Sequence, residues 1–217
     1  MVDYSIGVVA HVDRVDMAHE LSAIVDAKLV NVDDGRLGCS GNHAFMQSRL
    51  ASEPGWSVIL EDDAVPINEF PDDLAWCLEH APAPIVSLYL GTGYPAQAQP
   101  RILKALEADA SWIMHNRLLH AVGYCIAEDI KGELARWMSR NERGPGTAPD
   151  EAVSMWAYAR KIKVAYTNPS LCQHRDTPSV ILVRRGANNF AHGRNRPRKA
   201  HNITARPGGW DDTRVDM

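Results

Sequence analysis

Short apolar runs alternate with amphipathic segments along the first 90 residues of the chain. The apolar runs are rich in Val, Ile and Leu and are bounded by turn residues, so they predict buried strands at residues 5–10, 28–32, 57–60 and 85–90. Between them, apolar residues at helical spacing predict helices at residues 15–25, 38–52 and 74–80. This β-α order indicates a parallel sheet with crossover helices.

The order of elements changes after residue 90. A segment rich in Gly, Pro and Gln, residues 91–100, predicts a loop. Beyond it, the pattern predicts strands at residues 111–114, 121–126 and 163–166 and helices at residues 131–140 and 147–161. We therefore expect an α/β fold with a mixed central sheet.

Composition is that of a globular protein with room for one α/β domain: 217 residues, 45% of them hydrophobic and 23% charged. No apolar run reaches the roughly 18–20 residues that span a bilayer. The first residues carry no basic n-region, so we expect no signal peptide. The cysteines show no CxxC spacing, so we expect free thiols and a cytoplasmic protein. They are Cys39, Cys77, Cys125 and Cys172.

The net charge of −4 conceals an uneven distribution. Residues 1–183 contain 15 basic and 24 acidic residues, a net charge of −9, whereas residues 184–206 contain basic residues and no acid. The basic residues are Arg184, Arg185, Arg194, Arg196, Arg198, Lys199 and Arg206. We expect residues 1–183 to form the folded domain and residues 184–217 to form a basic C-terminal arm that binds an anion.

Three consecutive carboxylates, Glu61, Asp62 and Asp63, follow the apolar run at residues 57–60. They lie at the carboxyl end of a predicted strand, which is the edge where open α/β sheets bind ligands. Adjacent carboxylates repel one another unless a positive charge neutralises them. A hard divalent cation, Mg²⁺ or Mn²⁺, carrying a diphosphate fits this need. A hydrated acidic loop is the alternative.

Side-chain alternation along an extended backbone predicts that Glu61 and Asp63 share one side and that Asp62 faces elsewhere. His174 follows the last predicted strand and is the best candidate for a nitrogen ligand, which would favour Mn²⁺; an exposed loop histidine is the alternative. Cys172 lies two residues before His174, but no second Cys/His pair is nearby, so zinc is not expected there.

Asp150 and Glu151 follow Pro149 in the first turn of a predicted helix. They are candidates for a general base, but Thr147-x-x-Asp150 also resembles a capping box, which is a purely structural role. At the other end of the domain, His11 and Asp13 end the first strand, where a nucleotide base could bind.

The turn at residues 38–43 offers flexible backbone and a helix N-terminus, both suited to phosphate or sugar hydroxyls. Ser40 or Asn42 is the expected N-cap of that helix. This turn has neither a Walker nor a GxGxxG pattern, so it is a weak signal by itself.

In this order the motifs resemble glycosyltransferase family 25, the lipooligosaccharide and procollagen galactosyltransferase-like group. Gly38-Cys39…His43 resembles the family's Gly-Cys…Ser-His turn, and Glu61-Asp62-Asp63 its Glu-Asp-Asp motif after a strand. Gly123-Tyr124-Cys125-Ile126 resembles a later strand of the family, and Asp150 with Ser170–His174 and Ser179 resembles its ending. The resemblance covers roughly residues 5–180 and implies the GT-A fold, which is Rossmann-like.

The resemblance implies that a sugar is transferred from a nucleotide-diphosphate donor, expected to be a UDP-sugar, with inversion. Mn²⁺ or Mg²⁺ would be bound by Glu61, Asp63 and His174, and Asp150 would be the general base, with Glu151 as the second candidate. The donor would be held by Ala10, His11, Asp13, Gly38, Asn42, His43 and Asp62.

The acceptor is left open by the sequence. The basic arm favours a polyanion, so one hypothesis is a hydroxymethylated base in DNA, contacted through Arg184, Arg185, Arg194, Arg196, Arg198 and Lys199. A second hypothesis is a saccharide or protein acceptor, with the arm closing over the donor diphosphate. A third is a non-catalytic module that binds nucleotide or DNA.

Overall fold

The computed structural model describes residues 2–140, 147–175, 199–204 and 209–217. Within these residues a central sheet has eight strands, in the order β10-β6-β8-β5-β7-β3-β1-β2. The strands are β1 (Tyr4–His11), β2 (Leu29–Asp33), β3 (Trp56–Glu61), β5 (Ile85–Ser87), β6 (Trp112–His115), β7 (Gly123–Ile126), β8 (Val164–Thr167) and β10 (Arg214–Asp216). A separate two-stranded sheet joins β4 (Ala64–Pro66) to β9 (Cys172–His174).

The central sheet is mixed. Strands β2, β1 and β3 are parallel neighbours, and β7 then inserts antiparallel between β3 and β5. Strand β5 pairs in parallel with β8, which is antiparallel to β6. As a result, β1, β2, β3, β5 and β8 run in one direction, and their carboxyl ends share one edge of the sheet. The predicted α/β fold with a Rossmann-like first half and a mixed sheet is confirmed.

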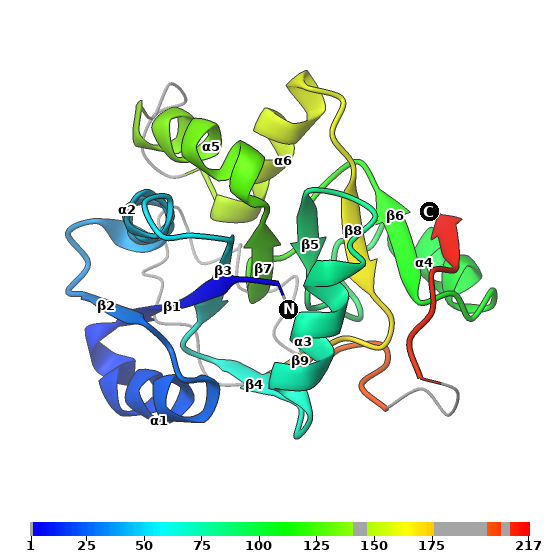
Figure 1. Ribbon diagram of the computed structural model, residues 1–217, viewed down its shortest axis with the longest axis horizontal. Coiled ribbons are helices and arrows are strands. Elements are labelled where there is room, and N and C mark those ends of the chain that lie inside the picture. The colour runs from blue at the N-terminus through cyan, green and yellow to red at the C-terminus, as the bar shows by residue number, and fades with distance from the viewer. Residues whose placement is uncertain (1, 141–146, 176–198, 205–208) are drawn as a thin grey trace.

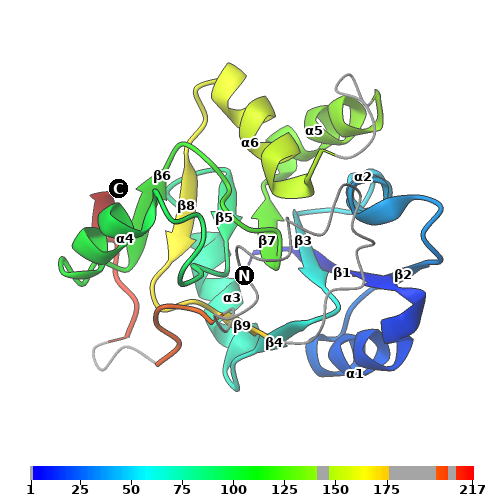
Figure 2. The ribbon, with the colours of Figure 1, turned by 180° about the vertical axis from the view of Figure 1, so that it is seen from behind.

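Helices cover both faces of the sheet (Figures 1 and 2). They are the 3-10 turn η1 (Val12–Arg14) and the helices α1 (Val15–Val25), α2 (Gly38–Leu50), α3 (Phe70–Glu79), α4 (Gln99–Leu106), α5 (Glu128–Arg140) and α6 (Pro149–Ala159). Helices α1 and α3 contribute to one buried apolar cluster, and α2, α4, α5 and α6 to the other. Side chains of β3 alternate between the two clusters, with Val58 in the first and Ile59 in the second.

The small sheet brings two distant parts of the chain together. Strand β4 begins directly after the acidic triad and pairs antiparallel with β9, so that Ala64 lies opposite His174. The backbone N–H of Arg175 also donates to the carbonyl of Asp63, at 2.7 Å. This pairing holds the end of β9 beside the carboxyl end of β3.

Local predictions were confirmed where the apolar pattern was regular, and wrong where it was not. The helix predicted at residues 15–25 has those bounds. The loop predicted at residues 91–100 is wrong at its end, because α4 begins at Gln99. The parallel sheet predicted for the first half is correct for β1, β2 and β3, but β5 is separated from them by antiparallel β7.

The last part of the chain packs against the folded domain. The bridge Gly91–Ala200 and the bond from the N–H of Ser170 to the carbonyl of Asn202 join residues 199–204 to it, and β10 extends the central sheet beside β6. Most of the predicted basic arm, including Arg184, Arg185, Arg194, Arg196, Arg198 and Arg206, lies outside the described residues. Lys199 is exposed, and its carbonyl accepts the N–H of Thr92.

The cysteines and the lengths of the helices were also considered in the sequence analysis. All four cysteines are free thiols, as their spacing predicted. Among the described segments, none of the helices has the length and apolar character that crossing a membrane requires.

Candidate functional site at the carboxyl edge of the sheet

The acidic triad lies where the parallel strands end. Glu61 is the last residue of β3, and Asp62 and Asp63 form the turn to β4. Neighbouring β1 ends at His11, directly before η1. Because β1 and β3 are parallel neighbours, their carboxyl ends place η1 next to the triad.

Arg14, in η1, neutralises two of the three acids. Its Nη1 atom donates to Oδ1 of Asp62 at 2.8 Å and to Oδ2 of Asp63 at 2.6 Å. The other oxygen of Asp62 accepts the backbone N–H of His11 at 3.0 Å. The expectation that Asp62 faces away from Asp63 is therefore wrong: side-chain alternation ends with the strand at Glu61, and the turn directs both aspartates toward Arg14.

Asp63 and His174, two of the three residues predicted to bind a metal, lie together. The Nε2 atom of His174 is 3.5 Å from Oδ2 of Asp63, and both residues are buried. The second oxygen of Asp63, Oδ1, is also buried and has no hydrogen-bond partner among the described residues. A buried carboxylate oxygen without a partner costs roughly 1–3 kcal/mol, so this position favours a cation or a proton.

The pKa of Asp63 also indicates that its position favours a cation or a proton. Burial, reinforced by the charge of Glu61, raises the pKa of Asp63 to about 7, even though Arg14 acts to lower it. One guanidinium does not compensate three clustered carboxylates. Additional positive charge next to Asp63 would therefore stabilise the ionised form of the site.

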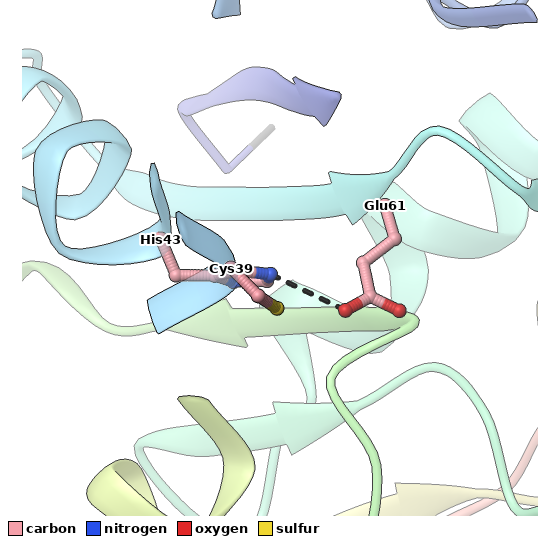
Figure 3. A group of neighbouring side chains, drawn as sticks. All are labelled: Cys39, His43 and Glu61. Atoms are coloured by element: carbon pink, nitrogen blue, oxygen red, sulfur yellow. Dashed lines mark ion pairs between the residues drawn. The ribbon is translucent and has the colours of Figure 1, made fainter. Parts of the chain in front are cut away.

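Glu61 faces a different group of side chains from the one predicted. Its Oε1 atom lies 3.3 Å from Nε2 of His43, a buried residue of α2. Cys39 lies one helical turn before His43, and the ligand-type atoms of Cys39, His43 and Glu61 are all within 4.8 Å of one another (Figure 3). Nδ1 of His43 is 3.1 Å from the hydroxyl of Tyr124 on β7.

These contacts divide the triad between two neighbouring groups. Glu61 belongs to the group with Cys39 and His43, whereas Asp63 belongs to the group with Arg14 and His174. In the part of the chain that the structure describes, Glu61, Asp63 and His174 do not form a set of ligand atoms within 4.8 Å of one another. The structure thus brings together Asp63 and His174, and it turns Glu61 toward α2.

Burial also changes the acidity of the thiol in this region. The surrounding protein, together with the charges of Glu61 and Asp150, raises the pKa of Cys39 to about 12. The thiol therefore stays protonated at neutral pH unless a cation binds beside it. As a nucleophile without such a cation, Cys39 would be inert.

Asp150 lies in the first turn of α6, near the same cluster. Burial raises its pKa to about 6; the charge of Glu61 adds to the increase, and backbone N–H groups at the helix start oppose it. An acid with a pKa near 6 suits proton transfer at neutral pH. Glu151, the second predicted base, is exposed.

The capping-box interpretation of residues 147–150 is wrong. The N-cap of α6 is Ala148, whose side chain makes no capping bond. The carbonyl of Thr147 instead accepts a bond from the hydroxyl of Ser40 on α2. The start of α6 is therefore attached to α2, which holds Asp150 near Cys39 and His43.

The turn at residues 38–43 lies in the first part of α2, whose start is capped by a side chain from outside the turn. Helix α2 begins at Gly38, so Ser40 and Asn42 lie inside it, and the prediction that one of them is the N-cap is wrong. The buried carboxylate of Asp33, at the end of β2, accepts the N–H groups of Leu37 and Gly38 at 3.0 and 2.9 Å. With these N–H groups already satisfied, no cap inside the turn is needed.

Asn42 connects α2 to the sheet. Its amide nitrogen donates to the carbonyl of Ala10 at 2.9 Å, and its oxygen accepts a bond from the side chain of Asn31 at 2.8 Å. Ala10 and Asn42 are both buried. These contacts give Asn42 and Ala10 a structural role, and their predicted contact with the donor stays a prediction.

His11 and Asp13 form the more accessible edge of the site. Nδ1 of His11 accepts the N–H of Asp13 at 3.2 Å and lies 3.3 Å from a carboxylate oxygen of the same residue. Asp13 is exposed and His11 is partly so. The predicted contact of this pair with a nucleotide base stays a prediction.

Sequence reasoning missed Arg14 and the partnership of His43 with Tyr124. Arg14 directly follows the His11–Asp13 segment that was singled out, and its position after a parallel strand was the signal that could have identified it. Tyr124 is fully buried, and its hydroxyl lies 3.1 Å from Nδ1 of His43.

No protein-family model and no curated protein matches the chain. Solved structures similar to it include A197 from STIV, with a TM-score of 0.43, 11% identity, and coverage of 78% of this chain and 85% of that chain. Another is a glycosyltransferase involved in the glycosylation of the major capsid of PBCV-1, with a TM-score of 0.39, 10% identity, and coverage of 76% and 83%. Both are distant similarities.

Proposed function

We propose that the chain is a glycosyltransferase that transfers a sugar from a nucleotide-diphosphate donor to a hydroxyl acceptor. The observation that carries this proposal is the contact between Asp63 and His174, which joins the acidic triad of β3 to β9 at the carboxyl edge of the sheet. This edge is where open α/β sheets bind ligands. A donor diphosphate placed there needs compensating positive charge.

The side chains around Asp63 fit a divalent cation. They offer a buried carboxylate oxygen without a hydrogen-bond partner among the described residues, and an imidazole nitrogen 3.5 Å from the other oxygen of that carboxylate. Oxygen ligands with one histidine suit Mn²⁺, and oxygen ligands alone suit Mg²⁺. When bound, such a cation would neutralise charge that develops on the diphosphate leaving group.

The protein's own groups would orient the donor around that position. Arg14 and the backbone N–H of His11 both bond Asp62, so Asp62 positions η1 at the edge of the site. His11 and Asp13 form the partly open rim, where we place the nucleotide base. We expect the donor to be a UDP-sugar, from which the nucleoside diphosphate UDP leaves.

Asp150 is the proposed general base. It would accept the proton of the acceptor hydroxyl while that oxygen attacks the anomeric carbon, and the diphosphate would leave from the opposite face. This in-line arrangement gives inversion. With a pKa of about 6, Asp150 is ionised at neutral pH and ready to accept a proton.

A panel of nucleotide sugars tests the proposal directly. We expect release of the nucleoside diphosphate from one donor in the presence of Mn²⁺ and no release with EDTA. Asp63→Asn should reduce that release by about 100-fold or more, beyond the 10–100-fold typical of losing a residue that only supports a metal ligand. If no donor is turned over in Mn²⁺, the proposed transfer is contradicted and a non-catalytic nucleotide-binding module is the better candidate.

The acceptor is a separate question. The panel should be repeated with hydroxymethylated duplex DNA, with saccharides and with peptides, and the products read by mass. A gel shift on DNA at low and high salt checks the nucleic-acid hypothesis, because binding through Arg and Lys weakens steeply with salt. Without a shift at low salt, the saccharide or protein acceptor is the better candidate.

A further inference from the structure

A second group of metal-ligand atoms lies beside the proposed donor site. Cys39 and His43 are four residues apart on α2, so they share one face of the helix, and Glu61 faces them from the end of β3 (Figure 3). The sulfur, the ring nitrogen and the carboxylate oxygen are within 4.8 Å of one another.

The orientation of His43 supports a ligand role. Its side chain is 1% exposed. Nδ1 lies 3.1 Å from the hydroxyl of Tyr124, and Nε2 is directed at the cluster, where it has no hydrogen-bond partner among the described residues. A hydroxyl that accepts the Nδ1 proton leaves the Nε2 lone pair free, and metal-bound histidines are held by this kind of second hydrogen bond.

One distance in the cluster matches that of two ligands on a tetrahedral ion. Ligand atoms held about 2.0–2.3 Å from a tetrahedral zinc ion are roughly 3.3–3.8 Å apart. Nε2 of His43 and Oε1 of Glu61 are 3.3 Å apart. If the Tyr124 hydroxyl accepts the Nδ1 proton, the Nε2 lone pair faces a carboxylate at that distance, which is repulsive; a cation between the two atoms would replace the repulsion with two attractive contacts.

The chemistry of the ligands selects the kind of metal. A thiolate, an imidazole and a carboxylate together favour zinc over Mg²⁺ or Ca²⁺, which prefer oxygen ligands alone. We propose that Cys39, His43 and Glu61 bind a zinc ion, with a fourth position open to water or a further ligand. Binding would release the thiol proton of Cys39 to solvent, leaving a thiolate on the metal.

This site goes beyond the proposed sugar transfer and does not depend on it. The zinc site involves α2 and Glu61, whereas the proposed diphosphate cation involves Asp63 and His174. Sequence analysis considered zinc only at Cys172 and His174. The signal for the site was the Cys-x-x-x-His spacing on a helix, which was assigned to the donor turn instead.

Cobalt substitution tests the site without any sugar donor. The intact protein, kept reduced with a phosphine, is titrated with Co²⁺ and then with Zn²⁺. We expect one equivalent of Co²⁺ to produce a thiolate-to-cobalt charge-transfer band, which Zn²⁺ then removes. Absence of this band in the wild-type protein would overturn the proposal.

Matched variants assign the ligands. Cys39→Ser should abolish the band, and His43→Gln should weaken Co²⁺ binding by more than about 10-fold. Cys77→Ala removes a buried thiol of α3 and should keep the band, and Asp63→Asn should keep it even where sugar transfer is lost. A band that survives Cys39→Ser contradicts the assignment.

A measurement on the wild-type protein covers the case in which Cys39→Ser does not fold. Zinc X-ray absorption of the stoichiometric complex should show one sulfur ligand together with nitrogen and oxygen ligands. A shell of nitrogen and oxygen alone would overturn the proposal. Loss of sugar transfer with an intact zinc shell would count only against the proposed function.

Discussion

Nη1 of Arg14 donates to Oδ2 of Asp63 at 2.6 Å, so a cation of the protein already occupies one side of the acidic triad. The same nitrogen donates to Asp62, and the Arg14 side chain is only 10% exposed. Yet the pKa of Asp63 remains raised, because burial and Glu61 outweigh Arg14. The arginine thus compensates only part of the negative charge, and the rest is available to the proposed divalent cation.

Replacement of Arg14 by Met should make the stability of the protein depend on divalent cations. Breaking a buried ion pair from one side costs about 3 kcal/mol, so we expect a loss of this size at pH 8 in EDTA. The loss should shrink at pH 5, where the freed carboxylates take up protons. Urea unfolding at the two pH values, with and without Mn²⁺, measures both effects.

Arg14→Lys is the matched control, since it keeps the charge and loses only the fork geometry. It should lie between wild type and Arg14→Met at pH 8. Equal stability of Arg14→Met and wild type in EDTA at pH 8 would show that Arg14 does not compensate the triad.

The rate of the proposed sugar transfer should follow the ionisation of Asp150. Its pKa of about 6 means that the base is ionised above that pH and protonated below it. We expect the rate constant of the chemical step to rise with pH and level off above about 7, being about 10-fold lower at pH 5. Asp150→Asn should lower the plateau and remove this pH dependence, whereas Glu151→Gln should keep both.

The same shift affects stability with the opposite sign. The folded protein holds the Asp150 proton up to about pH 6, whereas the unfolded chain releases it near the ordinary value of 3.8. The stabilising contribution is therefore fully present below about pH 4 and is lost as pH rises through 6. Relative to Asp150→Asn, the wild-type protein should lose on the order of 2–3 kcal/mol over this range, measured by urea unfolding in chelator.

Locally determined features were predictable from the sequence, and those that depend on distant pairing were not. Helix α1 has the predicted bounds, because its apolar stripe and its two ends lie within its own residues. Strands β4 and β9 have three residues each and carry no pattern of their own; each forms because the other is beside it. Helix α4 was hidden by the Gly- and Pro-rich segment that leads into it.

In the candidate site, too, some contacts could be predicted from the sequence and others could not. The proximity of Asp63 and His174 could be predicted from the sequence, because each follows a predicted strand and therefore lies at the same edge of the sheet. The division of the triad could not be predicted, because it depends on where β3 ends: alternation holds up to Glu61 and fails in the turn beyond it. Arg14 and Tyr124 become part of the site only through the order of the strands.

His174 should determine which divalent cation the site prefers. Imidazole nitrogen is a good ligand for Mn²⁺ and a poor one for Mg²⁺. His174→Gln should therefore weaken Mn²⁺ binding by about 10–100-fold and change Mg²⁺ binding little. Calorimetric titration of both ions compares the two affinities, and equal losses for both would indicate that His174 is not a ligand.

Close packing of α2 on β1 should make Gly7 intolerant of any side chain. A Cβ at Gly7 would lie 2.3 Å from Sδ of Met46 and 3.1 Å from a methyl carbon of Leu50, both buried on α2. Overpacking of this kind costs about 1–3 kcal/mol. Gly7→Ala should therefore lower the free energy of unfolding by that amount and shift α2, the helix that carries Cys39 and His43.

Gly132→Ala is the matched control, because it adds the same methyl group in a helix with room for it. The nearest atom to a Cβ at Gly132 is Nη1 of Arg136, at 3.5 Å, and the position lies within α5. Alanine is favoured over glycine inside a helix by about 1 kcal/mol, so this variant should be stabilised while Gly7→Ala is destabilised. If both variants unfold at the urea concentration of the wild-type protein, α2 does not pack on β1 as tightly as these distances require.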